Sequence, residues 1–163
     1  MIQKDIENLY REFQVPEHII KHMEAVAKFA GKIADVLTAK GIKINKKDLI
    51  HAAKIHDTLR VCDFKEISAA SFPYRVTEGQ IKFWKQLKAK YGKIGHEKAL
   101  AKILKSRGEV FIANLVAKHG FFSVTKLKTW EEKILYYADK RVEGNKIVSL
   151  NTRLKKGKKH KKA

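Results

Sequence analysis

The amino-acid sequence predicts an all-α fold, a single-domain helical bundle. Apolar residues recur at spacings of three and four over most of the chain, and only residues 121–125 have a locally extended pattern. The chain contains two prolines, which argues against many sharp loops. A length of 163 residues with 44% hydrophobic residues suffices for one well-buried core and is short for two. We therefore expect one domain, over residues 1–150.

Six segments of helical period follow one another along the chain. The first runs from about residue 16 to 39, where Gly41 stops it. The second runs from about 46 to 58, with Asn45 as its expected N-cap. Glycines separate the later segments, as expected of helix stops and turns. These later helices are expected at about 78–90, 97–105, 110–118 and 131–142.

Two segments depart from this pattern. Between residues 59 and 77 the periodicity is lost, which favours a lid or a substrate loop. From residue 153 to the end, the chain carries seven Lys and Arg residues and no acidic residue. Such a composition cannot bury enough apolar surface to fold. We therefore expect residues 151–163 to form a disordered polybasic tail.

The charge and the cysteine count restrict the classes of function. The chain has 36 Lys and Arg against 17 Asp and Glu, a net charge of +19, which attracts polyanions, nucleotides and anionic surfaces. A single cysteine excludes an intramolecular disulfide and a cysteine-based zinc cluster. No secretory signal and no apolar run of roughly 18 residues are present, so we expect a cytoplasmic protein without a membrane span.

The adjacent pair His56-Asp57, at the end of the second helical segment, is the most informative feature of the sequence. An imidazole nitrogen and a carboxylate oxygen are both suitable ligands for a divalent cation. Two ligands alone do not hold a catalytic metal. Further His and Asp residues, nearly all in helical segments, complete a set of six candidate ligands: His22, His56, Asp57, His96, His119 and Asp139.

The helical period places these side chains toward the interior. His22 shares a helix face with Val26, and Asp139 follows Leu135 by one turn. Taken singly, such a histidine is more often a hydrogen-bonded core residue than a ligand. A buried carboxylate, however, needs a positive partner. Several helices that each deliver an inward His or Asp therefore favour a bound cation.

The order of these residues resembles the HD-domain superfamily of metal-dependent phosphohydrolases, over roughly residues 15–145. In that family a histidine opens a long amphipathic helix, as His22 does, and a His-Asp doublet ends a second helix, as His56-Asp57 does. Members often have a lysine three residues after this aspartate, and Arg60 is the cation here. The chain is most similar to the small stand-alone members, some of which act on nucleotides or dinucleoside polyphosphates.

The resemblance implies a helical bundle with one or two divalent transition metal ions. The candidate metals are Fe, Mn, Zn and Ni. The first metal would be held by His22, His56, Asp57 and Asp139. Asp57 would bridge to a second metal, for which many members supply two further histidines. These match His96 and His119.

The residues near these ligands suit hydrolysis of a nucleotide or another phosphoester. A bound cation lowers the pKa of coordinated water from about 15.7 toward 7. We expect Asp57 and Arg60 to be catalytic, because Arg60 supplies a positive charge for the phosphate. Lys140 and Arg141 are candidate substrate contacts or solvated residues of a charged helix. His18 is a candidate for the pocket mouth, or a solvent-facing residue near a helix start.

A second hypothesis is a non-catalytic basic protein that binds RNA or another polyanion. The net charge and the basic tail favour weak phosphate binding that falls with salt. Against it, the sequence has no helix-turn-helix motif and no basic face interleaved with aromatic residues. It also lacks a phosphate-binding glycine loop and a nucleophile elbow. These observations favour the hydrolase.

Overall fold

The computed structural model describes residues 1, 3–153 and 155, and it confirms the all-α fold. Three short 3-10 helices are found among the described residues. They are η1 (Arg60–Asp63), η2 (Ala69–Ser71) and η3 (Phe121–Lys126). An antiparallel hairpin pairs β1 (Val142–Glu143) with β2 (Lys146–Ile147). The α-helices are α1 (Gln3–Glu12), α2 (Glu17–Ala39), α3 (Lys46–Ile55), α4 (Glu78–Tyr91), α5 (His96–Ser106), α6 (Val110–Ala117) and α7 (Trp130–Arg141).

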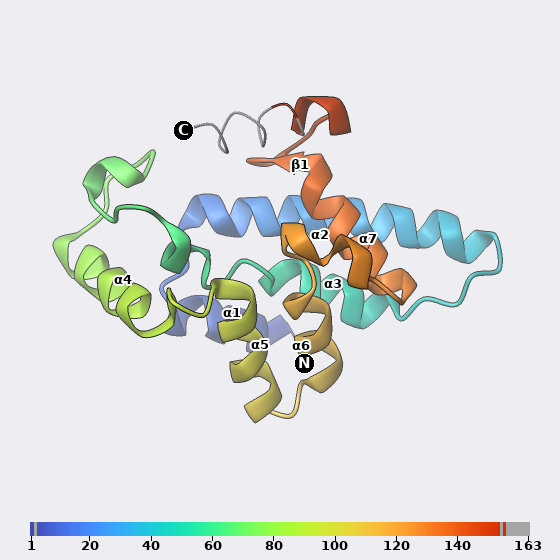
Figure 1. Ribbon diagram of the computed structural model, residues 1–163, viewed down its shortest axis with the longest axis horizontal. Helices are drawn as coiled ribbons and strands as arrows, with labels where there is room; N and C mark the ends of the chain where they lie inside the picture. Colours follow the sequence, from blue (N-terminus) through green and yellow to red (C-terminus); the bar gives the residue numbers. More distant parts are fainter. Residues whose placement is uncertain (2, 154, 156–163) are drawn as a thin grey trace.

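The helix α3 lies at the centre of the bundle. It contacts α1, α2, α6 and α7, and α2 runs along the length of the molecule above it (Figure 1). Leu49, Ala52, Ala53 and Ile55 of α3 have no solvent exposure. Residues that directly follow α3 are therefore held inside the bundle, where side chains from several other helices can reach them.

The structure places the ends of α2 and α3 close to the expected residues. Gly41, with φ of +85°, follows α2, a conformation that side chains with a Cβ rarely adopt. Asn45 caps α3 by accepting a hydrogen bond from the Asp48 amide. α3 ends at Ile55, three residues before the predicted end, because the Thr58 hydroxyl and amide both donate to the Ile55 carbonyl. His56 and Asp57 thus lie in the turn after the helix.

The extended conformation expected at residues 121–125 is wrong, since this stretch forms η3. The Ser123 amide donates to the Gly120 carbonyl, and the Tyr136 hydroxyl of α7 donates to the Phe121 carbonyl. A short apolar run does not by itself distinguish a strand from a helical turn. α1 and the hairpin were not predicted, because α1 buries only Ile6 and Leu9 and each strand has two residues.

The aperiodic segment 59–77 packs against the bundle rather than lying free. Val61, Ile67 and Phe72 are buried, and the Phe72 ring lies 4.5 Å from the ring of Trp84 in α4, measured between centroids. Arg60 and Phe64 of this segment line the cavity described below. The segment therefore forms a packed part of the wall of that cavity.

The predicted tail lies for the most part outside the described residues. Residues 150–153 form a helical turn, in which the Arg153 amide donates to the Ser149 carbonyl. Among the described residues, none of the helices combines the length and the apolar character that crossing a bilayer requires.

We predict that Trp84→Ala lowers the free energy of unfolding by about 3–5 kcal/mol, the cost of removing a large buried aromatic side chain. Trp84 is 1% exposed, and its indole nitrogen donates to the Gln14 carbonyl at 2.9 Å, which holds the α1–α2 connection. Trp130→Ala is the matched control, because Trp130 is 44% exposed and its loss should cost about 1 kcal/mol or less. Urea titration measures both, and equal losses would contradict the role given to Trp84.

Candidate metal centre

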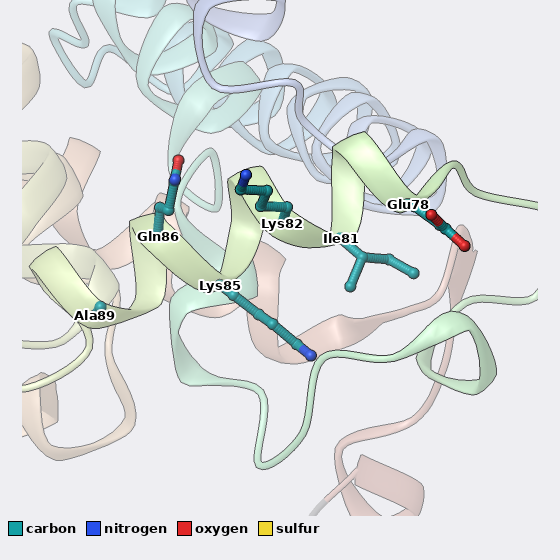
Figure 2. A pocket seen from close by; sticks show the side chains of 6 residues that line it. All are labelled: Glu78, Ile81, Lys82, Lys85, Gln86 and Ala89. Atoms are coloured by element: carbon teal, nitrogen blue, oxygen red, sulfur yellow. The ribbon is translucent and has the colours of Figure 1, made fainter.

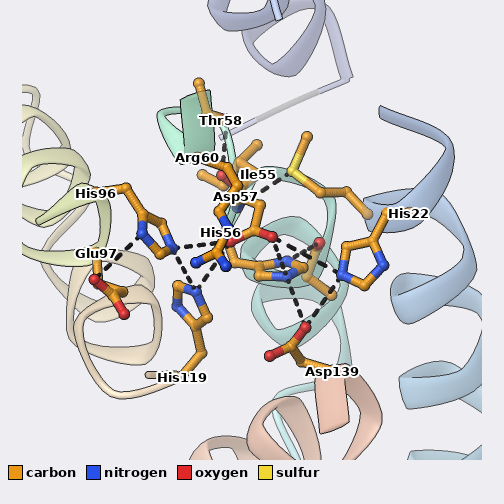
Figure 3. A network of polar contacts seen from close by, with 12 residues as sticks. His22, Ile55, His56, Asp57, Thr58, Arg60, His96, Glu97, His119 and Asp139 are labelled. Carbon is orange, nitrogen blue, oxygen red and sulfur yellow. Dashed lines mark hydrogen bonds and ion pairs between the residues drawn. The ribbon is translucent and has the colours of Figure 1, made fainter. Parts of the chain in front are cut away.

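The six predicted ligands converge on one place in the bundle (Figure 3). Their ligating atoms form two groups, and within each group all of these atoms lie within 4.8 Å of one another. Asp57 belongs to both groups. The first group comprises His22, His56, Asp57 and Asp139, and the second comprises Asp57, His96 and His119.

The two oxygens of Asp57 face different groups. Its Oδ1 lies 2.9 Å from Nε2 of His96 and 3.3 Å from Nε2 of His119. Its Oδ2 lies 3.9 Å from Nε2 of His22 and 3.8 Å from Nε2 of His56. Asp139 adds its Oδ1 to the first group, at 3.1 Å from His22 and 3.5 Å from His56. Asp57 is therefore the carboxylate that the two groups share.

Each of the four imidazoles turns Nε2 toward the cluster and uses Nδ1 to contact an acceptor outside it. The acceptors are the Gly144 carbonyl for His22 (2.8 Å), the Ala53 carbonyl for His56 (2.8 Å), Asp63 for His96 (2.5 Å) and the Val116 carbonyl for His119 (2.6 Å). A carbonyl or a carboxylate only accepts, so Nδ1 carries a hydrogen, and in the neutral form of the imidazole Nε2 keeps its lone pair. Metal-binding histidines in proteins have this arrangement.

The lone pairs that meet inside the cluster require a positive charge between them. His56 is fully buried, and its Nε2 has no hydrogen-bond partner among the described residues. The Nε2 atoms of His96 and His119 lie 3.1 Å apart. Such atoms repel one another unless a proton or a cation lies between them, because buried polar atoms need partners. The donor set of imidazoles and carboxylates fits a divalent cation.

The electrostatics of the cluster keep both aspartates ionised. Burial alone would raise the pKa of Asp57, but the neighbouring His56 and hydrogen bonds from His119 and His96 hold this pKa well below its usual value. Burial likewise opposes ionisation of Asp139, and Lys140 and His22 keep its pKa well below the usual value. Both carboxylates are thus charged at neutral pH and available to a cation.

A cavity of about 710 Å³ opens onto the cluster. His22, Asp57, His96, His119 and Asp139 line it. Arg60 and Lys140 do so too, together with His18, whose Nδ1 lies 2.9 Å from the Tyr74 hydroxyl oxygen. The cavity thus contains imidazole, carboxylate, cationic and apolar side chains, as expected of a small-molecule site.

Lys140 and Arg60 are held differently at this cavity. The ammonium of Lys140 lies 2.5 Å from Oδ2 of Asp139 and donates to the His119 carbonyl at 3.2 Å. Arg60 is about half exposed, and its guanidinium lies 3.6 Å from Oδ2 of Asp63. Lys140 therefore neutralises the outer oxygen of a ligand, whereas the guanidinium of Arg60 can turn toward a bound anion.

The structure does not bring Arg141 to the cluster. Its Nε donates to the Val148 carbonyl, its Nη1 donates to the Tyr137 hydroxyl at 2.5 Å, and its guanidinium lies over the rings of Phe29 and Tyr137. Successive residues on a helix point about 100° apart, so Lys140 and Arg141 face different sides. Arg141 fastens the hairpin to α7 instead of lining the cavity.

A second hollow of about 630 Å³ lies along α4 and contains no group of ligands (Figure 2). All its lining residues belong to that one helix, and the amino groups of Lys82 and Lys85 point in different directions. It is an open surface groove. The cavity with convergent polar groups is the candidate site.

Sequence reasoning missed several residues of this site. Asp63 accepts from Nδ1 of His96 and, through Oδ1, from the amide of the same residue at the start of α5 (3.3 Å). The sequence does show an acidic residue shortly after Asp57, and this could have indicated a supporting contact near the cluster. The Gly144 carbonyl had none, because a backbone acceptor is not visible in a sequence. Arg153 also lines the cavity, although its stretch was assigned to the tail.

Comparison with known families agrees with this geometry. A model of the HD domain family matches residues 19–143, a span that contains all six ligands. No curated protein and no solved structure matches the chain.

We predict that a divalent cation stabilises the folded protein through Asp57. A ligand that binds only the folded state at 100 times its Kd adds about 2.7 kcal/mol of stability. Thermal unfolding of chelator-treated protein, with and without added Mn²⁺, should show a higher Tm with the ion. Asp57→Ala should abolish the increase, while His51→Ala, on α3 but outside the cluster, should retain it. An undiminished increase in Asp57→Ala would contradict the assignment.

We also predict that Asp63→Ala weakens the second group of ligands and spares the first. Loss of such a supporting acceptor typically lowers metal affinity about 10- to 100-fold. Titration with Co²⁺, followed by its visible absorbance, should resolve this loss. Asp63→Asn should retain part of the affinity, since an amide oxygen still accepts. Asp35→Ala, at an exposed aspartate paired with Lys46, is the control. A uniform loss in both groups would count against this role of Asp63.

Proposed function

The chain belongs to the HD-domain family, and on this basis we propose that it is a metal-dependent phosphohydrolase that acts on a nucleotide or another phosphoester. The observation that carries the proposal is the common orientation of the four imidazoles around Asp57. In each, Nδ1 contacts an acceptor outside the cluster and Nε2 points into it, where the neutral imidazole offers its lone pair. A core built only for packing has no need to direct four Nε2 atoms at two carboxylates.

The two groups would hold one or two divalent transition ions, with Fe, Mn, Zn and Ni as the candidates. His22, His56, Asp57 and Asp139 would hold the first ion, and His96, His119 and the shared Asp57 the second. The chemistry that such ions supply when bound is a lower pKa of water and positive charge next to the phosphoryl oxygens. The protein contributes the fixed geometry of the ligands.

The side chains around the cluster bind and orient the phosphate. Arg60 is the proposed phosphate contact, because a guanidinium forms two parallel hydrogen bonds with phosphate oxygens. Its place three residues after Asp57 brings this charge to the cavity. Lys140, held by Asp139 and the His119 carbonyl, adds a fixed positive charge beside the proposed ligands. His18 lines the cavity as a hydrogen-bonding group.

We predict that hydrolysis of bis(4-nitrophenyl) phosphate depends on a divalent ion and on Asp57. Release of 4-nitrophenol, followed by absorbance, should fall to the background rate after chelation or in Asp57→Ala. Arg60→Ala should lower kcat/KM by about 10²-fold, the loss typical of one charge-stabilising donor, and Arg60→Lys by less. Arg107→Ala, at an exposed arginine paired with Glu12, is the control. Hydrolysis that survives in Asp57→Ala would overturn the proposed function.

The net charge of +19 supports a second, separate property, weak binding of RNA or another polyanion. Removing residues 156–163 deletes five lysines and leaves Arg153 in the cavity. We predict that this truncation weakens binding to single-stranded RNA, measured by mobility shift at several salt concentrations, while hydrolysis is unchanged. Loss of RNA binding in Asp57→Ala instead would place the polyanion site at the cluster.

A further inference from the structure

One wall of the cavity is apolar and takes no part in the proposed phosphate chemistry. Phe121 and Phe122 of η3, which are 50% and 80% exposed, line it together with Leu150, which is 39% exposed. We call these three residues the aromatic wall. Exposed apolar surface that lines a cavity often marks a ligand-binding site.

The aromatic wall is attached to the segments that position the metal ligands. Phe121 follows the ligand His119 by two residues, and its carbonyl accepts from Tyr136 of α7, the helix that carries Asp139. The rings of Phe121 and Phe122 pack edge to face, with centroids 5.8 Å apart. Leu150 follows the hairpin whose Gly144 carbonyl holds His22. The wall therefore keeps a defined position relative to the cluster.

The volume of the cavity indicates that the ligand is larger than a phosphate group. About 710 Å³ falls within the roughly 300–1,000 Å³ of sites that enclose a drug-sized molecule. Arg60 and Lys140 provide for the phosphate. The remaining space, next to the aromatic wall, is available to the organic part of the substrate.

The chemistry of the wall favours a planar ring with polar edges. Phenyl rings attract the face or the edge of another ring. Stacking of this kind tolerates any flat aromatic group. Arg153 and Glu143 line the same cavity and offer a cation and a carboxylate to polar ring substituents.

We propose that the aromatic wall is a specificity subsite that binds a planar aromatic ring on the phosphoester substrate, with Phe122 as the main contact. The proposal rests on the proposed function and adds to it the class of substrate. This class is a phosphoester whose alcohol carries an aromatic ring, either a nucleobase or a simple aryl group.

The test compares two substrates that differ only by the ring, adenosine 5′-monophosphate and ribose 5-phosphate, with the metal-loaded full chain. Phe122→Ala should raise KM for the nucleotide about tenfold to a hundredfold, the loss expected for one stacked base. KM for ribose 5-phosphate and both kcat values should change little. Phe122→Trp should retain the low KM. The control Phe111→Ala removes a phenylalanine that is 41% exposed on α6 and does not line the cavity.

Phenyl phosphate distinguishes the two sources of the ring. A rise in its KM in Phe122→Ala, equal to that of the nucleotide, identifies a general aryl subsite. A rise for the nucleotide alone identifies a nucleobase subsite. Equal effects of Phe122→Ala on adenosine 5′-monophosphate and ribose 5-phosphate, or no effect on either, would overturn the proposal.

Binding of adenosine, which has no phosphate, separates this proposal from the proposed function. Saturation-transfer NMR should show contact of its base with the wild-type protein and loss of that contact in Phe122→Ala. Binding without any hydrolysis would support the subsite and count against the hydrolase. Absence of binding, combined with a change in oligomeric state in Phe122→Ala, would overturn the subsite and identify the wall as an interface between copies of the chain.

Discussion

The charge balance around Asp57 is the constraint on which the rest of the structure depends. Its two oxygens face separate sets of imidazoles. Asp139 lies beside the set that contains His22 and His56. Two buried carboxylates are costly to desolvate, and lone pairs directed at them repel. Helices from the whole length of the chain must meet at this point, and the proposed cations would satisfy their side chains together.

A second layer of contacts makes this convergence specific. The backbone carbonyls of Ala53, Val116 and Gly144 determine which nitrogen of three histidines carries the hydrogen, and Asp63 does so for His96. These acceptors come from helix ends and from the hairpin, where carbonyls are not used within a helix. The irregular ends of the helices thus orient the ligands, while the regular parts build the core.

The cavity combines two kinds of recognition. Its cluster and its cations suit the phosphate, which is common to every phosphoester and so does not by itself select one. The aromatic wall suits the part of a substrate that differs between phosphoesters. Both regions are attached to α7 and to the residues around His119, so catalysis and selectivity would be built on the same elements.

The sequence by itself determined the helical class, most helix bounds and the six His and Asp residues that converge in the cluster, because helical periodicity and the His-Asp doublet are local patterns. The tertiary structure decided which acceptors support the imidazoles, namely Asp63 for His96 and the Gly144 carbonyl for His22. It also decided the orientation of Arg141 and the inclusion of Arg153 in the cavity. It likewise decided η3, where an apolar run was expected to be extended, and α1, which has few buried residues. The physical reason is that a side chain's chemical type is written in the sequence. Its partners depend on packing between segments up to 122 residues apart, the separation of His22 from Gly144.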